Sequence, residues 1–209
     1  MDSRHEAIER ALGYPFPAPA RSYLLRDGGA QELDPSAVET AGRVALCAYG
    51  SNAAPDVLAT KLGPDAEPVA VVRDELKDFD AVYSAHIAAY GSVPATLRHS
   101  PGTTIPVFIA NVTAEQLERI ALTEPNYELE TIRGHPTFVS RHGHLLMDGT
   151  PVALKRIEAR GRTLPALGQR EALDHVRSVM RPDLDLESFI LEWVAGSIPA
   201  RPLDGPEAA

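Results

Sequence analysis

The feature that most constrains the fold is the stretch of residues 44–52, Val-Ala-Leu-Cys-Ala-Tyr-Gly-Ser-Asn. It begins as a short apolar run typical of a buried strand and breaks into a loop at Gly50. Pro55 then favours a helix over residues 54–62, which Gly63 would end. Such a unit points backbone N–H groups and the positive end of a helix at one place, which suits a carboxylate or an oxyanion. A tight turn in which Asn52 caps the helix is the simpler interpretation.

Composition excludes several classes of partner. The 209 residues are 44% hydrophobic, which suffices for one domain with some decoration. The net charge of −9 argues against nucleic acid and anionic membranes, because no basic stripe is present to neutralise phosphates. No apolar run is long enough for a transmembrane helix, and no apolar signal-peptide core follows the N-terminus. Cys47 is the single cysteine, so no intrachain disulfide or cysteine metal cluster forms, and we expect a cytoplasmic protein.

Periodicity and turn signals predict an α+β fold and divide the chain into an arm, a domain and a tail. Residues 1–42 form the arm, which we expect to add a hairpin to the sheet or to wrap a neighbouring subunit of a homo-oligomer. Residues 43–196 form the domain, which ends in two helices. Residues 197–209, rich in Pro and Gly, form a tail that we expect to be disordered. The domain's further strands are expected at residues 68–73, 78–85, 95–97, 105–112, 137–140 and 144–147. Its further helices are expected at residues 113–124 and 169–180. A last helix follows these and carries the apolar stripe Leu186, Phe189, Ile190, Trp193 and Val194.

Glu124 lies on the apolar side of the helix predicted over residues 113–124. It follows at helical spacing three apolar side chains, Leu117, Ile120 and Ala121. A carboxylate placed there is costly unless it is paired, protonated or used, and burial favours the neutral form that a general acid or base needs near neutral pH. Two simpler interpretations remain: Glu124 reaches water at a fraying helix end, or it pairs with an arginine such as Arg133.

Tyr49-Gly50-Ser51-Asn52 resembles the signature of the γ-glutamylcyclotransferase-like family, in which a buried strand ends in Tyr-Gly-Ser-Asn. The family's other parts follow in order over residues 44–132: Ala95-Thr96-Leu97, the strand of residues 105–112, and a short helix that ends in a glutamate, here Glu124. The chain departs from the family where no aspartate precedes this glutamate and Pro125 replaces a glycine. An alignment shifted by two would place Asn126 there, with Glu128 nearby, but the helix face favours Glu124.

The resemblance implies a mixed, barrel-like β-sheet with flanking helices and an intramolecular reaction. The α-amine of a small γ-glutamyl substrate attacks its own side-chain carbonyl and releases 5-oxoproline and a free amine or amino acid. By this resemblance Glu124 is the catalytic acid and base. The backbone of Gly50, Ser51 and Asn52 binds the α-carboxylate or the oxyanion, and Tyr49 walls the pocket or donates its hydroxyl. No metal and no organic cofactor are implied.

Other constellations favour ordinary structural roles. His142 and His144 flank a predicted turn without an acidic or cysteine partner, so a metal site is not expected there. Cys47 lies in an apolar run, which is typical of an unreactive core thiol. A hydrolase that uses Ser51 as its nucleophile needs a histidine base, and the spacing places neither His86 nor His99 beside it.

The sequence is also compatible with two other functions. A non-catalytic domain of the same fold would use the cleft to hold a small carboxylate ligand or would serve assembly through its arm. The same pocket would also suit hydrolysis of a different amide. The position of Glu124 separates an enzyme from a scaffold, because an enzyme needs this carboxylate within hydrogen-bond reach of residues 50–52, whereas a scaffold lets it point to solvent.

Overall fold

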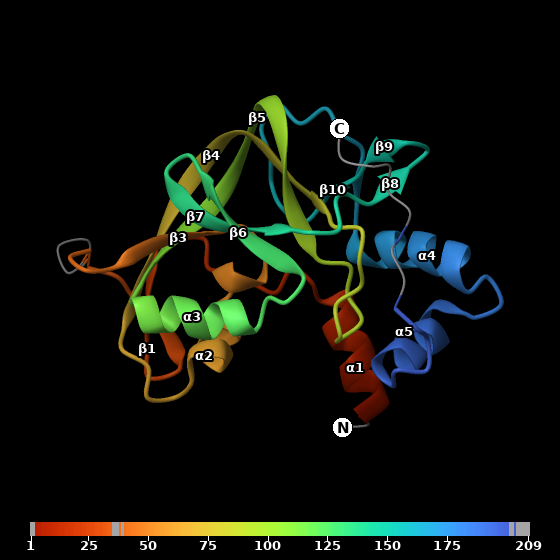
Figure 1. Ribbon diagram of the computed structural model, residues 1–209, viewed down its shortest axis with the longest axis horizontal. Helices are drawn as coiled ribbons and strands as arrows, with labels where there is room; N and C mark the ends of the chain where they lie inside the picture. Colours follow the sequence, from red (N-terminus) through yellow and green to blue (C-terminus); the bar gives the residue numbers. More distant parts are fainter. Residues whose placement is uncertain (1–2, 35–37, 39, 201–202, 204–209) are drawn as a thin grey trace.

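The computed structural model describes residues 3–34, 38, 40–200 and 203, and in this part of the chain five α-helices flank a large mixed sheet (Figure 1). None of these helices is long and apolar enough to cross a membrane. The elements in chain order are α1 (Ser3–Leu12), β1 (Tyr23–Arg26), β2 (Gly29–Glu32), β3 (Val44–Ala48), the 3₁₀ turn η2 (Ser51–Ala53), α2 (Pro55–Leu62), β4 (Val69–Tyr83), β5 (Ala95–Val112), α3 (Ala114–Leu122), β6 (Tyr127–Ile132), β7 (His135–Ser140), β8 (Leu146–Met147), β9 (Thr150–Pro151), β10 (Ala153–Leu154), β11 (Ala166–Leu167), α4 (Gln169–Met180) and α5 (Leu186–Val194).

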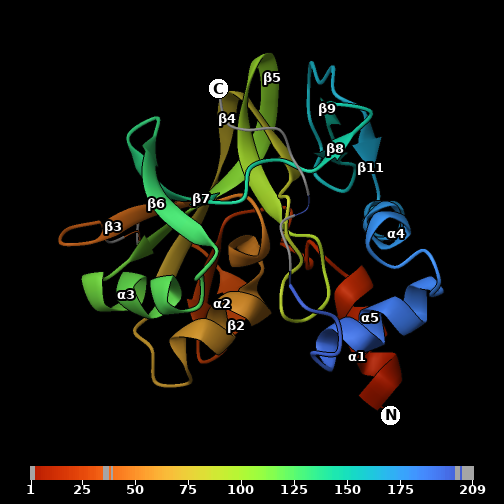
Figure 2. The ribbon, with the colours of Figure 1, turned by 45° about the vertical axis from the view of Figure 1, so that its right-hand side comes forward.

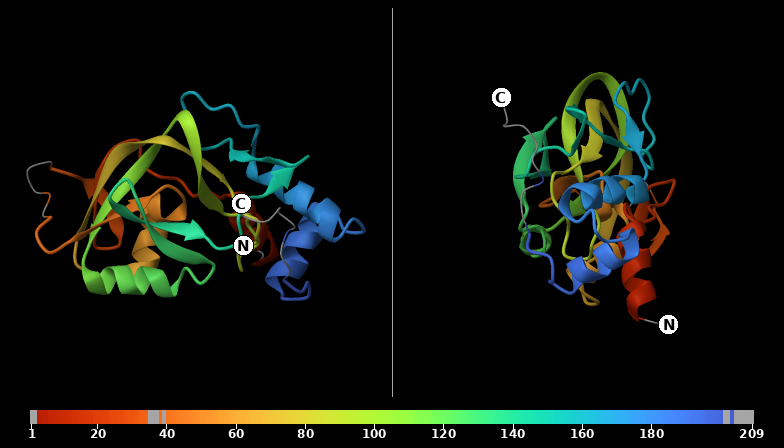
Figure 3. Two further views of the ribbon diagram at one scale, coloured as in Figure 1. Left: turned by 45° about the horizontal axis from the view of Figure 1, so that its top comes forward. Right: turned by 90° about the vertical axis from the view of Figure 1, so that its right-hand side faces the viewer.

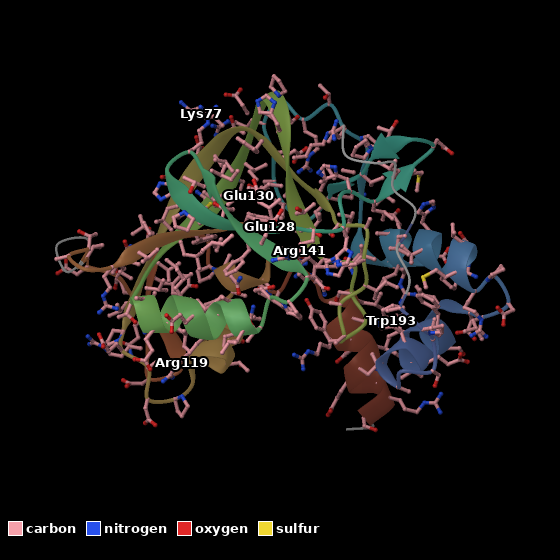
Figure 4. All side chains as sticks on the ribbon, viewed as in Figure 1. Lys77, Arg119, Glu128, Glu130, Arg141 and Trp193 are labelled. Carbon is pink, nitrogen blue, oxygen red and sulfur yellow. The ribbon has the colours of Figure 1, made fainter. Side chains whose placement is uncertain are left out.

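Strands β4 and β5 form one long antiparallel ribbon, where the sequence predicted two strands in each segment. The predicted break is a bulge, at which the register shifts between Lys77 and Phe79. Asp78 takes a positive φ of 63° there, and its carboxylate accepts the Gly102 N–H at 3.0 Å. Lys77 lies near the top of the molecule in Figure 4, where the ribbon bends. The chain therefore bends at residue 78 instead of beginning a new strand there.

Strand β3 lies within the sheet and contacts an apolar core on each face. In β3, Leu46 and Ala48 belong to a core covered by α2 and α3, whereas Cys47 belongs to a second core that receives residues of α1, α4 and α5. Figure 2 shows α2 and α3 on one side of the view and α1, α4 and α5 on the other. Burial on both faces explains why this strand is a continuous apolar run without alternation.

The sheet is mixed, as the resemblance implied for a barrel-like sheet, but it is not a closed barrel. Its strand order is β11-β10-β4-β5-β3-β7-β6, which leaves β11 and β6 at the ends, and β1 branches from β4. Closure requires the end strands to pair with each other. Here β11 and β6 do not pair with each other, and β4 carries two neighbours along one side, β1 at Val69 and β10 at Val82.

Strand β6 was not predicted, because it lies at the edge of the sheet and is largely exposed. Glu128 and Glu130, labelled along this strand in Figure 4, carry charge where a half-buried strand would carry apolar residues. The turn expected at His142 is present, but the strands on either side of it do not pair with each other. Strand β7 pairs with β6 and, in parallel, with β3, whereas β8 pairs with β9 through a turn at Asp148.

The helix boundaries follow the capping signals of the sequence. Helix α2 begins with Pro55 and ends at Gly63, whose φ of 86° suits a glycine. The spacing of Thr113 and Gln116 predicts a capping box, and α3 has it: Thr113 Oγ1 accepts the Gln116 N–H at 3.1 Å. On α5 the apolar stripe is buried at its centre, but Val194 at its end is 42% exposed, so the stripe is shorter than expected.

The predicted arm packs against the domain at two places. Strands β1 and β2 form a hairpin that pairs with β4, as one of the two expectations stated. Helix α1 packs beside α5, which Figure 3 shows in its right-hand view. Assembly of subunits through the arm stays a prediction. In the tail predicted to be disordered, Ile198 is buried in the core, and residues 201–202 and 204–209 lie outside the described part of the chain.

Two ion pairs fasten the segment before β11 to β4. Arg162 donates from Nε and Nη2 to the carboxylate of Asp80 at 2.8 and 2.7 Å, and the two side chains are only 13% and 0% exposed. Arg160 makes a similar two-point contact with Glu75, with both distances 2.7 Å, but these side chains are 72% and 44% exposed. The two pairs differ chiefly in burial.

We expect Arg162→Ala to lower the free energy of unfolding by about 3–5 kcal/mol, because it leaves the Asp80 charge buried without its partner. Arg160→Ala is the matched control and should cost much less, because water solvates Glu75. Urea unfolding of the two variants measures the difference. Equal losses would show that burial does not set the strength of these pairs.

Candidate functional site

A cavity of about 540 Å³ lies where β3 ends, a volume suited to a small ligand. Its wall includes the loop of residues 49–52, one side of α2, the segment of residues 86–95 and the segment of residues 123–127. The arm also contributes to it, through Arg10, Tyr14 and Phe16. The predicted substrate-binding residues and Glu124 therefore face one cavity.

The loop after β3 tightens into η2, in which the Ala53 N–H donates to Gly50 O at 3.0 Å. The first N–H groups of such a turn have no acceptor within the turn. The N–H groups of Ser51 and Asn52 therefore make no hydrogen bond inside η2. The simpler interpretation, in which Asn52 caps the next helix, was wrong. The N-cap of α2 is Ala54, without a side-chain hydrogen bond, and the Asn52 amide bonds elsewhere.

Asn52, Lys61 and Glu124 form a closed triangle of hydrogen bonds. Glu124 Oε1 accepts from Asn52 Nδ2 at 2.9 Å and from Lys61 Nζ at 2.5 Å. Lys61 Nζ also donates to Asn52 Oδ1 at 2.7 Å. The side chains of Lys61 and Glu124 are 13% and 12% exposed, so the pair is shielded from most of the solvent. Each member comes from a different element, namely η2, the last turn of α2 and the segment after α3.

The second carboxylate oxygen of Glu124, Oε2, has no hydrogen bond to the described residues. In this part of the structure no fully buried side-chain nitrogen or oxygen lacks a partner. Oε2 therefore keeps accessible surface, and Glu124 lines the cavity. One oxygen is anchored while the other is open to a ligand, which is the arrangement that proton transfer requires.

Of the residues considered for the catalytic position, Glu124 alone contacts the loop of residues 50–52. Asn126 Oδ1 instead accepts from the ring of His142 at 3.1 Å, and Glu128 is exposed on β6 (Figure 4). The expected alternative pairing with Arg133 was wrong, because Arg133 binds Asp78 at 2.8 Å. Glu124 also lies beyond the last helical residue, in a turn where its carbonyl accepts the Tyr127 N–H at 3.1 Å.

Lys61 was not singled out from the sequence, although helical spacing offered a signal. Leu58 and Leu62 bury one side of α2, and the adjacent side carries Val57 and Lys61, one turn apart, both of which line the cavity. Arg119, labelled in Figure 4, donates from α3 to the Leu62 carbonyl at 3.0 Å. This bond ties the end of α2 to α3 and helps to bring Lys61 near Glu124.

Tyr14 is the second site residue that the sequence analysis missed. Its hydroxyl oxygen accepts the Ala95 N–H at 2.8 Å and lies so close to the loop that a Cβ atom added to Gly50 would be 2.6 Å from it. Gly50 is therefore required by this close approach. Nothing in the local pattern around Tyr14 pointed to the site, because the contact joins the arm to residues far along the chain.

Four tyrosines of the cavity wall keep their protons at neutral pH: Tyr14, Tyr49, Tyr90 and Tyr127. Burial raises the pKa of each of these hydroxyl groups, and the nearby negative charge of Glu124 adds to the effect. The Tyr49 hydroxyl donates to Phe138 O at 2.5 Å, so of its two expected roles only that of a wall is left. The four tyrosine side chains are therefore uncharged neighbours of the Lys61–Glu124 ion pair.

His86 is a buried histidine at the cavity. Its ring lies against the ring of His142, with centroids 4.8 Å apart and an interplanar angle of 38°, and Nδ1 lies 2.7 Å from Ser84 Oγ. Burial lowers the pKa of His86 to about 3, and the neighbouring His142 contributes. The ring is therefore neutral at physiological pH.

The remaining candidates have ordinary surroundings. Burial raises the pKa of the Cys47 thiol to about 11, so it is protonated at neutral pH. His144 lies 3.4 Å from a backbone carbonyl, and no group of three or more metal-binding side chains occurs in the described residues. His86 bonds to Ser84 instead of Ser51, and His99 packs on Phe79. A serine nucleophile at residue 51 therefore has no histidine base bonded to it in the described structure.

Comparison with known proteins adds no relative: no protein-family model, curated protein or solved structure matches the chain. A proposal of function therefore rests on the geometry of the cavity and on the sequence resemblance over residues 44–132.

We expect Gly50→Ala to lower the free energy of unfolding by about 1–3 kcal/mol, because the new methyl group meets the Tyr14 hydroxyl. In a Tyr14→Phe background the same substitution should cost less, since the clashing oxygen is gone. A double-mutant cycle by urea unfolding measures this coupling. Additive losses would mean that the loop does not depend on this approach.

A second prediction concerns pH. Unfolding raises the pKa of His86 from about 3 to about 6.5, so below pH 6.5 the unfolded chain binds more protons and stability falls as the pH drops toward 3. Between pH 7 and pH 5 this loss amounts to about 2 kcal/mol. We expect His86→Gln, which cannot titrate, to lose less stability than the unchanged protein over that interval in urea unfolding. Parallel losses in both proteins would contradict the lowered pKa.

Proposed function

We propose that this protein is a γ-glutamylcyclotransferase-like enzyme that releases 5-oxoproline and a free amine or amino acid from a small γ-glutamyl substrate. The observation that carries the proposal is the 2.9 Å bond between Glu124 and Asn52 at the edge of the cavity. It joins the Tyr-Gly-Ser-Asn motif to the glutamate that the resemblance identifies, 72 positions apart in the chain. The fold of that family and a cytoplasmic location belong to the same proposal.

The reaction is an exchange of one carbon–nitrogen bond for another within one molecule. The α-amine forms a bond to the γ-carbonyl carbon and loses a proton, and the bond to the leaving nitrogen breaks once that nitrogen gains a proton. Atoms balance without water. Because nucleophile and electrophile are already linked, the protein has to fold the substrate and move one proton.

Glu124 moves that proton in this proposal. Its Oε2 atom accepts the proton of the attacking amine and delivers it to the leaving nitrogen, while Oε1 stays bonded to Asn52 and Lys61. The N–H groups of Ser51 and Asn52 bind the α-carboxylate of the substrate. Lys61 adds a positive charge beside this loop, which favours the same carboxylate. Tyr49 and the other tyrosines exclude water.

One observation favours the alternative of a non-catalytic domain that binds a small carboxylate. The Lys61 ammonium lies 2.5 Å from Glu124 Oε1, and both side chains are largely buried. This ion pair is complete without a substrate, as it would be in a domain in which Glu124 only holds Lys61 in the wall of a carboxylate site.

We expect the purified protein to release 5-oxoproline from at least one member of a panel of γ-glutamyl amines and γ-glutamyl dipeptides. Glu124→Gln keeps the shape and removes the base, so it should lower kcat by about 10²–10⁴-fold. Glu128→Gln is the matched control, because Glu128 is exposed on β6, and it should leave kcat unchanged.

Melting temperatures measured with and without each compound complete the experiment. If no compound turns over but some raise the melting temperature, the binding domain replaces the enzyme as the best function. If Glu124→Gln retains full activity, the base has been wrongly assigned.

A further inference from the structure

His86 adjoins the cavity but has no part in the proton transfer proposed above. It is 7% exposed and packs edge-on against Tyr127, with ring centroids 5.6 Å apart. It is also the end of a chain of hydroxyl groups, because Ser84 Oγ lies 2.7 Å from His86 Nδ1 and 2.6 Å from Ser140 Oγ. Ser84 is fully buried, so water does not complete these bonds.

The direction of this chain fixes the tautomer of His86. Ser140 Oγ already accepts the backbone N–H of His142 at 3.1 Å. If Ser140 donates to Ser84 and Ser84 donates to Nδ1, every hydroxyl proton has an acceptor. In the opposite direction, Nδ1–H donates to Ser84, Ser84 donates to Ser140, and the Ser140 proton has no acceptor in the described structure. Unused buried donors are costly, so the first direction is favoured and the proton of the ring is on Nε2.

The Nε2–H group is open to the cavity. Nε2 has no hydrogen bond to the described residues, and among these no fully buried side-chain nitrogen lacks a partner. Nε2 therefore keeps accessible surface. Because His86 lines the cavity and is otherwise covered, that surface belongs to the cavity.

The donor and the base are connected through one short turn. The Tyr127 N–H donates to the Glu124 carbonyl, and the ring of Tyr127 packs on His86. Arg141, labelled in Figure 4, donates to the Tyr127 carbonyl from Nε at 3.0 Å and holds the turn against the end of β7. The turn of residues 124–127 thus sets the positions of both the His86 ring and the Glu124 carboxylate.

We propose that His86 is a catalytic residue that donates its Nε2–H to the carbonyl oxygen under attack, an assignment that rests on the proposed function. The oxygen gains negative charge as the new carbon–nitrogen bond forms and loses it when the leaving nitrogen departs, and the proton stays on Nε2. A neutral, fixed donor stabilises such transient charge without holding a permanent anion. The depressed pKa of the ring agrees with a donor that never carries charge itself.

The first measurement does not depend on activity. Nitrogen-15 NMR of the unchanged protein at pH 7 should show His86 with a protonated Nε2 and an unprotonated Nδ1. Ser84→Ala, which removes the hydroxyl chain, should produce a mixture of tautomers. A ring protonated at Nδ1 in the unchanged protein overturns the proposal.

The second measurement uses the γ-glutamyl substrate that gives the most 5-oxoproline. His86→Phe keeps a ring without a donor and should lower kcat by about 10²-fold with little change in KM. His86→Gln retains an N–H donor and should recover at least a tenth of the activity. His99→Gln, a histidine outside the cavity, is the control and should match the unchanged protein.

The outcomes separate the two proposals. If the unchanged protein releases no 5-oxoproline, the proposed function fails, and with it the assignment of the carbonyl oxygen to His86. If the protein is active and His86→Phe retains its kcat, the His86 proposal fails while the proposed function stands. Loss in His86→Phe with recovery in His86→Gln supports both.

Discussion

The antiparallel ladder between β4 and β5 is the interaction on which the rest of the structure depends. Strand β3 extends the sheet from β5, and β1 and β10 extend it from the two ends of β4. The two ends of the ladder are buried on both faces, so there a shift by one residue would exchange one apolar environment for another. In its middle, exposed residues are interspersed with buried ones, and the bulge at Asp78 bonds to Gly102 across the ribbon. This bond adds specificity to the register of the strands.

The site depends on this ladder only indirectly, through the helices packed on it. Asn52, Lys61 and Glu124 come from three elements that approach one another because α2 and α3 cover the same face of the sheet. Their charges are partly shielded from water and surrounded by neutral tyrosine rings, so the electrostatic interactions among them are stronger than on an exposed surface. Such a network is sensitive to small displacements of any one element.

The sequence predicted those parts of the fold that local interactions determine. The limits of α2 and the capping box of α3 follow from residues adjacent to them, and both were confirmed. The continuity of β4 could not be foreseen, because the polar residues between its two apolar halves look the same whether a strand bends or ends. Strand β6 carries charged residues since it lies at an edge. The order of the strands in the open sheet depends on pairings between distant segments, which no local pattern encodes.

The candidate site could be predicted only in part, for the same reason. The helix face of Glu124 and the Tyr-Gly-Ser-Asn motif were visible in the sequence, and the structure brings them together. The helical spacing placed Lys61 on one side of α2, but nothing in the sequence distinguished it from the other residues on that side. Tyr14 reaches Gly50 and Ala95 from the first residues of the chain, and a contact over such a separation leaves no trace in hydrophobic periodicity.

The packing of α1 beside α5 makes the cavity depend on an element that does not line it. Arg10 and Tyr14 form part of the cavity wall, and α1, which carries Arg10, packs against α5. None of residues 186–194 lines the cavity. A displacement of α5 would therefore open one wall of the ligand site without touching the sheet or the Asn52 loop.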